Sequence, residues 1–200
     1  MKVSRIRALR GPNLWSRHTA LEAIITCTDA ESAIDNLPGF EPRVRSLFPA
    51  IGALRPGGYV GPVSLAHVLE SATLALQANA GCPVTFSRTS ATTESGVYQT
   101  VVEYSEEAVG RLALELAQAL LHAALNETGF DLGAALAQLR DLDEDERLGP
   151  STGAIVDAAV ARGIPYKRLT KGSLVQFGWG ARQRRIQAAE LDGTSAVSES

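Results

Sequence analysis

The 200-residue chain carries 19 Lys and Arg against 22 Asp and Glu, and 45% of its residues are hydrophobic. This composition is typical of a globular protein with a full core, and it excludes a disordered tail. No apolar run approaches the span of a bilayer helix, and the opening MKVSRIR lacks the apolar segment of a signal peptide. We therefore expect a cytoplasmic protein with no membrane contact, in which Cys27 and Cys82 are buried free thiols.

Two periodicities organise the first 140 residues. Alternation of apolar and polar residues predicts strands, whereas apolar residues three or four positions apart predict helices. The order strand, strand, helix, helix, strand, strand, helix predicts an α+β fold with an antiparallel sheet and helices packed on one face. The expected strands are residues 3–9, 20–28, 83–89 and 97–104, and the expected helices are 42–54, 63–80 and 106–126, with a short helical piece at 130–140.

The charge composition of the chain changes after residue 140. Five of the six residues from 141 to 146 are acidic, whereas the segment that follows is rich in Arg and Lys. We interpret residues 1–140 as one domain, residues 141–150 as a solvated linker, and residues 151–200 as the incomplete start of a second domain.

The second domain is expected to open with a helix at 154–161, for which Ser151 and Thr152 are N-cap candidates. Thr194-Ser195 would cap a further helix. Gly178-Trp179-Gly180 lacks the length and the lysine of a phosphate-binding loop, so it predicts a hairpin turn. The short strands expected here are residues 166–169, 173–177 and 185–189.

The stretch AHVLES, residues 66–71, is one residue short of a zinc-binding helix. Inverted metallopeptidases carry H-x-x-E-H, in which the two histidines bind zinc from one helical face and the glutamate acts as general base. This chain has His67 and Glu70, but Ser71 stands where the second histidine would be. A serine hydroxyl is a poor zinc ligand, and a catalytic zinc normally needs three protein ligands.

The remaining histidines, His18 and His122, are not at helical spacing from His67. We therefore expect no metal and no catalytic residue here, only a vestigial site. In this interpretation His67 is a partly buried helix residue, hydrogen-bonded to a neighbour such as Glu70 or Glu103.

Four stretches, in order along the chain, resemble the cyanophycin synthetase family. The resemblance runs through both expected domains, from the first residues to the last. The stretches are LRGPNLWS at 9–16, SGVYQTVVEY at 95–104, LGPSTGAIVDAAVARGIP at 148–165 and SLVQFGWGARQRRIQA at 173–188.

This resemblance implies a longer parent enzyme, an amide ligase that uses ATP to extend an aspartate backbone and attach arginine. It implies that residues 1–140 are the N-terminal domain and residues 151–200 the first elements of an ATP-grasp domain. ATP and magnesium would bind beyond Ser200, so no cofactor is expected in this chain. The implied partners are the cyanophycin polymer, the remainder of the ligase and further copies of the chain. In some members the N-terminal domain resembles a zinc hydrolase that cuts cyanophycin to make primers.

Several polar residues are candidates for contact with such a polymer. The amides of the helix that follows Ser151 and Thr152 favour an anion, so these two residues are candidate substrate ligands as well as caps. Arg10 lies in a segment that is either a recognition loop or a structural turn pinned by Trp15. Single arginines suited to carboxylates are Arg43, Arg45, Arg55 and Arg88.

Three hypotheses remain open from the sequence. The chain is the non-catalytic N-terminal region of a ligase, an independent zinc hydrolase, or a polymer-binding module that functions alone. A nucleic-acid partner is not expected, because Arg182, Arg184 and Arg185 lack interleaved aromatic residues and the rest of the chain is acidic.

Overall fold

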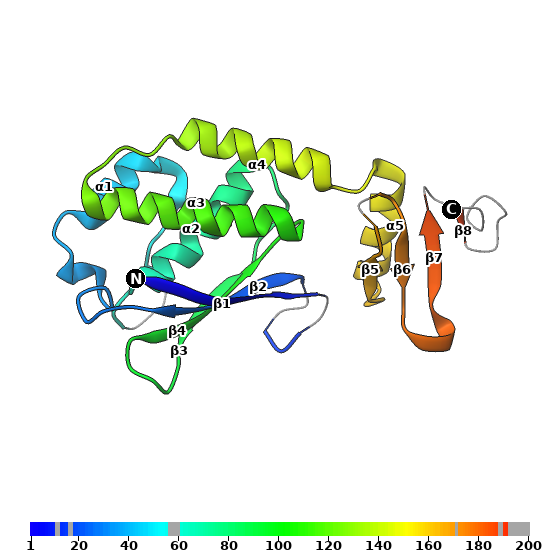
Figure 1. Cartoon of the computed structure of the whole chain (residues 1–200), viewed down its shortest axis with the longest axis horizontal. Helices are drawn as coiled ribbons and strands as arrows, with labels where there is room; N and C mark the ends of the chain where they lie inside the picture. The colour runs from blue at the N-terminus through cyan, green and yellow to red at the C-terminus, as the bar shows by residue number, and fades with distance from the viewer. Residues whose placement is uncertain (11–12, 16–17, 56–60, 171, 188–189, 192–200) are drawn as a thin grey trace.

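A four-stranded antiparallel sheet organises the first part of the chain (Figure 1). The computed structural model describes residues 1–10, 13–15, 18–55, 61–170, 172–187 and 190–191. The strands lie in the order β1-β2-β4-β3, and all neighbours are antiparallel. Their bounds are β1 Lys2–Leu9, β2 Ala20–Thr26, β3 Ser87–Ala91 and β4 Val97–Glu103.

Alternation along β2 gives the sheet two different faces. Leu21, Ala23 and Ile25 are buried, and Ala23 and Ile25 belong to the main hydrophobic core. Glu22 points the opposite way, where Arg7 and Gln99 donate hydrogen bonds to its carboxylate. The period-two pattern of this strand therefore places one side of the sheet against helices and leaves the other side polar.

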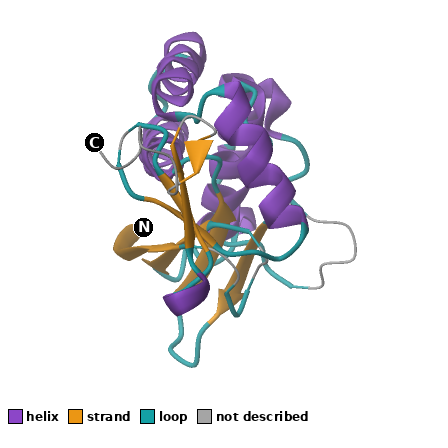
Figure 2. Cartoon of the chain, turned by 90° about the vertical axis from the view of Figure 1, so that its right-hand side faces the viewer, coloured by secondary structure: helices purple, strands orange, loops and turns teal. Residues whose placement is uncertain are grey.

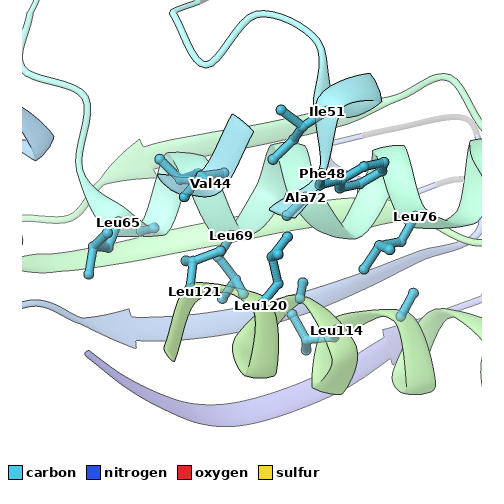
Figure 3. Packing of buried hydrophobic residues seen from close by; sticks show 14 of the residues in the cluster. Val44, Phe48, Ile51, Leu65, Leu69, Ala72, Leu76, Leu114, Leu120 and Leu121 are labelled. Carbon is cyan, nitrogen blue, oxygen red and sulfur yellow. The ribbon is translucent and has the colours of Figure 1, made fainter. Parts of the chain in front are cut away.

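Two helices, α2 (Leu65–Ala80) and α3 (Glu107–Asn126), pack on the apolar face of the sheet, and α1 (Phe40–Leu47) and α4 (Leu132–Glu146) pack on these two helices (Figures 1 and 2). Apolar side chains of α2 and α3 interdigitate with Val44, Phe48 and Ile51 from the segment that precedes them (Figure 3). The α+β class and the antiparallel sheet predicted from the sequence are confirmed. Short 3-10 turns lie at Ile34–Asn36 and Pro49–Ile51.

The helix α3 is more apolar than we expected for any segment of the sequence. Its 20 residues and a mean hydropathy of 1.3 over its most apolar part would suffice to cross a membrane, so the expectation that no segment approaches that span was wrong. Half of that part is buried inside the protein, including Ala113, Ala117 and Leu120. The apolar residues of α3 therefore include those that pack in the core of the protein.

Two expected elements have different bounds, for local reasons. The helix expected at 42–54 ends at Leu47, because Pro49 disfavours helical geometry at the residue before it and starts a separate turn. The strand expected at 83–89 is displaced to β3. The backbone N–H groups of residues 85 and 86 donate to the Glu103 carboxylate, both at 2.8 Å, and only the Phe86 carbonyl bonds to the backbone of residue 103, so the regular ladder begins at Ser87.

The acidic residues expected in a solvated linker are helical instead. The helix α4 continues to Glu146, so only residues 147–149 separate it from the next helix. The apolar face that buries Leu139 continues to Leu142, which packs on the core. Asp143 accepts hydrogen bonds from the Ser105 hydroxyl at 3.0 Å and the Cys82 thiol at 3.7 Å. Packing and these bonds hold the acidic turns on the first lobe, which we define as residues 1–146.

A second, smaller lobe, residues 150–191, follows (Figure 1). Its antiparallel sheet has the order β5-β6-β7-β8, and its core contains Val156, Val175 and Ile186. Gly178-Trp179-Gly180 connects β6 to β7, which confirms the predicted hairpin turn; both glycines have positive φ. The segment Thr194-Ser195 lies outside the described residues. The elements are α5 Pro150–Ala161, β5 Tyr166–Arg168, β6 Val175–Phe177, β7 Arg184–Gln187 and β8 Glu190–Leu191, with a 3-10 turn at Gly180–Arg182.

The burial of α4 yields a stability prediction. Leu139→Ala removes a side chain that is 0% exposed, and we expect it to lower the free energy of unfolding by about 2–4 kcal/mol. Gln138→Ala alters the neighbouring exposed position and should change it by less than about 0.5 kcal/mol. Urea unfolding of both variants measures the difference. Equal stability of the two variants would contradict the assignment of α4 to the first lobe.

Candidate functional site

The start of α2 places His67 in a structural role. Ser64 precedes the helix, its backbone N–H donates to His67 Nδ1 at 3.3 Å, and its hydroxyl lies 2.8 Å from the same nitrogen. The imidazole is 6% exposed and packs edge-on against Tyr98, with ring centroids 5.7 Å apart. Burial lowers the pKa of His67. The ring is thus a neutral capping group that satisfies the end of a buried helix.

The other residues of the predicted vestigial site face different partners. The half-buried Glu70 is hydrogen-bonded to the hydroxyls of Ser87 and Thr89 on β3, and burial raises its pKa despite these bonds. Ser71 is also half-buried. The expected hydrogen bond of His67 to a neighbour is present, but the described partner is Ser64 rather than Glu70 or Glu103.

The remaining histidines do not complete a metal site. His18 Nδ1 lies 3.2 Å from Glu103 Oε1, at the end of β4 where Gln77 also bonds. Gln77 is ten residues beyond His67, which separates the two by about 15 Å along α2. His122 is exposed on α3. Among the residues that the structure describes, no three His, Cys, Asp or Glu side chains lie close enough together to hold a metal ion.

The predicted hydroxyl cap of α5 is displaced. Gly149 is the N-cap residue, and its carbonyl accepts the Gly153 N–H at 2.8 Å, with Pro150 in the first turn. Proline suits this position because it lacks the N–H that would be unpaired there. Ser151 is exposed, whereas Thr152 is 2% exposed. The cap assignment was therefore wrong, and only Ser151 remains accessible as a candidate carboxylate ligand.

Three of the four arginines proposed for the polymer have partners within the first lobe, although Arg45 and Arg55 are 43% and 46% exposed. Arg43 donates to the Ala124 carbonyl at 2.6 Å, and Arg45 and Arg55 form ion pairs with Glu41 and Asp35 respectively. Arg88 is exposed on β3. Near the turn that contains Arg10, Asn13 accepts the Trp15 N–H at 2.9 Å; Gly11 and Pro12 lie outside the described residues.

A cavity of about 590 Å³ lies between the two lobes. It is not predictable from sequence patterns, because its walls come from segments far apart in the chain. From the first lobe they come from the end of β1, the start of α3 and the end of α4; from the second lobe they come from β5. The charged and aromatic lining residues are Arg10, Tyr104, Glu106, Glu107, Arg111, Glu146, Tyr166, Lys167 and Arg168.

One part of the lining of this interlobe cleft is basic. Glu107 receives hydrogen bonds from Arg10 at 2.8 Å and from Arg111 at 2.9 Å. Burial raises the pKa of Glu107, but these two bonds outweigh that effect and the pKa is lowered. Two guanidinium groups thus share a single carboxylate, and Lys167 lies exposed nearby.

A second part of the cleft lining, around Glu106, is acidic and partly desolvated. Burial raises the pKa of Glu106 to about 7; Arg168 opposes this shift, whereas Asp143 and Glu146 add to it. Arg168 Nη1 lies 3.8 Å from Glu106 Oε2, and Arg168 hydrogen-bonds to the carbonyls of Glu146 and Gly172 instead. Burial likewise raises the pKa of Tyr104 to about 12.

These features define a class: a two-lobed α+β protein in which each lobe contains an antiparallel sheet. Residues 24–126 match the family model described as "Cyanophycin synthase-like N-terminal domain", and the chain belongs to this family. The family resemblance seen in the sequence is thereby confirmed.

Curated relatives extend the similarity beyond that domain. The cyanophycin synthetases of Trichormus variabilis and Geminocystis herdmanii are each 35% identical over 212 residues, covering 98% of this chain and 24% of the relative. That of Synechocystis sp. is 34% identical over 94% of this chain and 23% of the relative. The chain thus spans about a quarter of the length of these relatives.

The acidic part of the cleft lining generates a pH-dependent prediction. A carboxyl whose pKa is raised in the folded state loses stability as pH rises from its unfolded value, about 4.5, through about 7. Glu106→Gln removes this loss, so the variant should exceed the original chain in unfolding free energy by about 1–3 kcal/mol at pH 8, with little difference at pH 5.

Chemical denaturation at pH 5, 6, 7 and 8 measures this difference. Glu115→Gln, at an exposed position of α3, is the matched control and should leave the profile unchanged. A Glu106→Gln profile parallel to that of the original chain would show that Glu106 has an ordinary pKa.

Proposed function

We propose that this chain is the N-terminal region of an ATP-dependent amide ligase that builds cyanophycin from aspartate and arginine. In this proposal the region is non-catalytic, and it serves to hold the polymer and to assemble the enzyme as a cytoplasmic homo-oligomer. The observation that carries it is the similarity to curated cyanophycin synthetases over 98% of the chain.

We further propose that the second lobe begins an ATP-grasp domain. Its core of Val156, Val175 and Ile186 is small. Three apolar side chains of the lobe, Ile155, Val160 and Ile164, are 37–42% exposed, which suits packing against further polypeptide of the ligase. ATP and magnesium would then bind outside this chain, since Gly178-Trp179-Gly180 forms a hairpin turn rather than a phosphate-binding loop.

The alternative of a zinc hydrolase has less support from the geometry. His67 caps its own helix, and Glu70 bonds to β3, so both groups are engaged with the protein rather than with a common cation site. A water-activating zinc needs three protein ligands as well as an open position.

Metal content and hydrolysis distinguish these two functions. We expect the purified chain to hold less than about 0.1 zinc per molecule after incubation with zinc and dialysis, because the ligand set is incomplete. We also expect no shortening of cyanophycin, measured by gel electrophoresis of the polymer. Stoichiometric zinc, together with cleavage that Glu70→Gln abolishes, would establish the hydrolase instead.

Polymer binding distinguishes a holding role from mere scaffolding. We expect the chain to co-sediment with insoluble cyanophycin at about 20 mM salt and to be released near 0.5 M, because contacts between exposed charges are screened over a few ångströms at high salt. A globular protein of similar size and net charge is the control. A chain that stays in the supernatant at low salt would rule out polymer binding by this region.

A further inference from the structure

The lining of the interlobe cleft contains a basic group of side chains around Glu107 and an acidic group around Glu106. Around Glu107, two guanidinium groups and one carboxylate leave a net positive charge, and the exposed Lys167 also lines the cleft. Around Glu106, the neighbouring carboxylates of Asp143 and Glu146 outnumber the single guanidinium of Arg168. A ligand with a cation at one end and an anion at the other would have charges complementary to both groups of residues.

Glu106 has unused capacity to accept hydrogen bonds. No donor among the described residues hydrogen-bonds to its carboxylate, and the nearest cation, Arg168 Nη1, is 3.8 Å away. The side chain of Glu106 is only 27% exposed, so water compensates for this only in part. Desolvated carboxylates gain most from a planar guanidinium, which can donate two parallel hydrogen bonds.

The size and the remaining lining suit a short peptide-like ligand. A volume of about 590 Å³ lies within the range of small-molecule sites, about 300–1,000 Å³. Tyr104 and Tyr166 add aromatic surface, on which the aliphatic stem or the plane of an arginine side chain can rest.

We propose that the interlobe cleft binds a zwitterionic unit that carries a guanidinium group, with the guanidinium against Glu106 and the carboxylate toward Arg10, Arg111 and Lys167. This inference rests on the proposed function, in which the polymer carries arginine on an aspartate backbone. Occupation of the cleft by one such unit would bridge the lobes, because Glu106 belongs to the first lobe and Lys167 to the second.

Binding is expected to depend on pH through Glu106. The groups that face it are Asp143 and Glu146 of α4, Tyr166 and Arg168 of β5, and Tyr104 at the end of β4. Since burial raises the pKa of Glu106 to about 7, the carboxyl is mostly protonated at pH 6 and mostly ionised at pH 8. A guanidinium prefers the ionised form, so affinity should rise with pH over this interval.

The test uses the 200-residue chain and the dipeptide β-aspartyl-arginine as probe, titrated by calorimetry at low salt and pH 8. We expect Glu106→Gln to weaken binding about tenfold or more, as expected for the loss of a charge-assisted hydrogen bond. Glu115→Gln, on the same helix, should match the original chain within about twofold. Aspartate alone, which lacks the guanidinium, should bind far more weakly.

A second readout does not depend on a variant. In carboxyl-detected NMR of the original chain, saturating dipeptide should lower the titration midpoint of Glu106 by about one pH unit, the shift that corresponds to tenfold tighter binding to the ionised form. An unchanged midpoint, equal affinities of the Glu106→Gln and Glu115→Gln chains, or no binding of the dipeptide would overturn the cleft assignment.

Failure of this inference can be told apart from failure of the proposed function. If the original chain and the Glu106→Gln chain co-sediment equally with insoluble cyanophycin, the region does hold the polymer, but the cleft is not the site that binds it. If the dipeptide binds as expected but the chain does not co-sediment with cyanophycin, the cleft assignment stands and the region does not hold the polymer.

Discussion

The packing of α2 between the sheet and the other helices is the constraint on which the first lobe depends. Nine of its sixteen residues are buried, from Leu65 to Gln77, so the helix has little access to water for its terminal N–H groups. At the start of the helix, the backbone N–H of Ser64 donates to His67 Nδ1. Near its end, the side-chain amide of Gln77 donates a hydrogen bond to the Glu103 carbonyl. The imidazole that resembles a metal ligand in the sequence is therefore required by the packing of its own helix.

The same packing determines where the two lobes meet. The helix α4 lies over α2 and α3 through Leu139 and its neighbours, and its last turns carry Asp143 and Glu146 to the start of α3. There they face Glu106, while Arg168 approaches from the second lobe. The acidic residues 141–146 have the composition of a solvated linker, but here they lie beside the cleft. Leu142 packs on the core, and the Ser105 hydroxyl donates a hydrogen bond to Asp143, so this segment is held on the first lobe.

Much of the fold could be predicted from the sequence, because periodicity reports burial directly. The alternation in β1 and β4, the apolar stripe of α2 and the order of the elements predicted the α+β class and the antiparallel sheet. The errors have two local causes. The Glu103 carboxylate accepts the backbone N–H groups before β3, and α5 begins at Pro150, one residue before the expected hydroxyl cap. The cleft could not be predicted, since Arg10, Glu106 and Arg168 are brought together only by the tertiary fold.

Two half-buried carboxylates with raised pKa values lead to different conclusions about chemistry. Glu70 sits in the motif that suggested a metal, yet hydroxyls of Ser87 and Thr89 already bond to it, which ties α2 to the edge strand. Glu106 belongs to no motif, and no described donor bonds to it. A desolvated acceptor that its own fold leaves without a donor gains more from an incoming cation than one that the fold has satisfied. Recognition of a charged ligand is therefore better placed at the boundary of the lobes than at the helix whose sequence first suggested it.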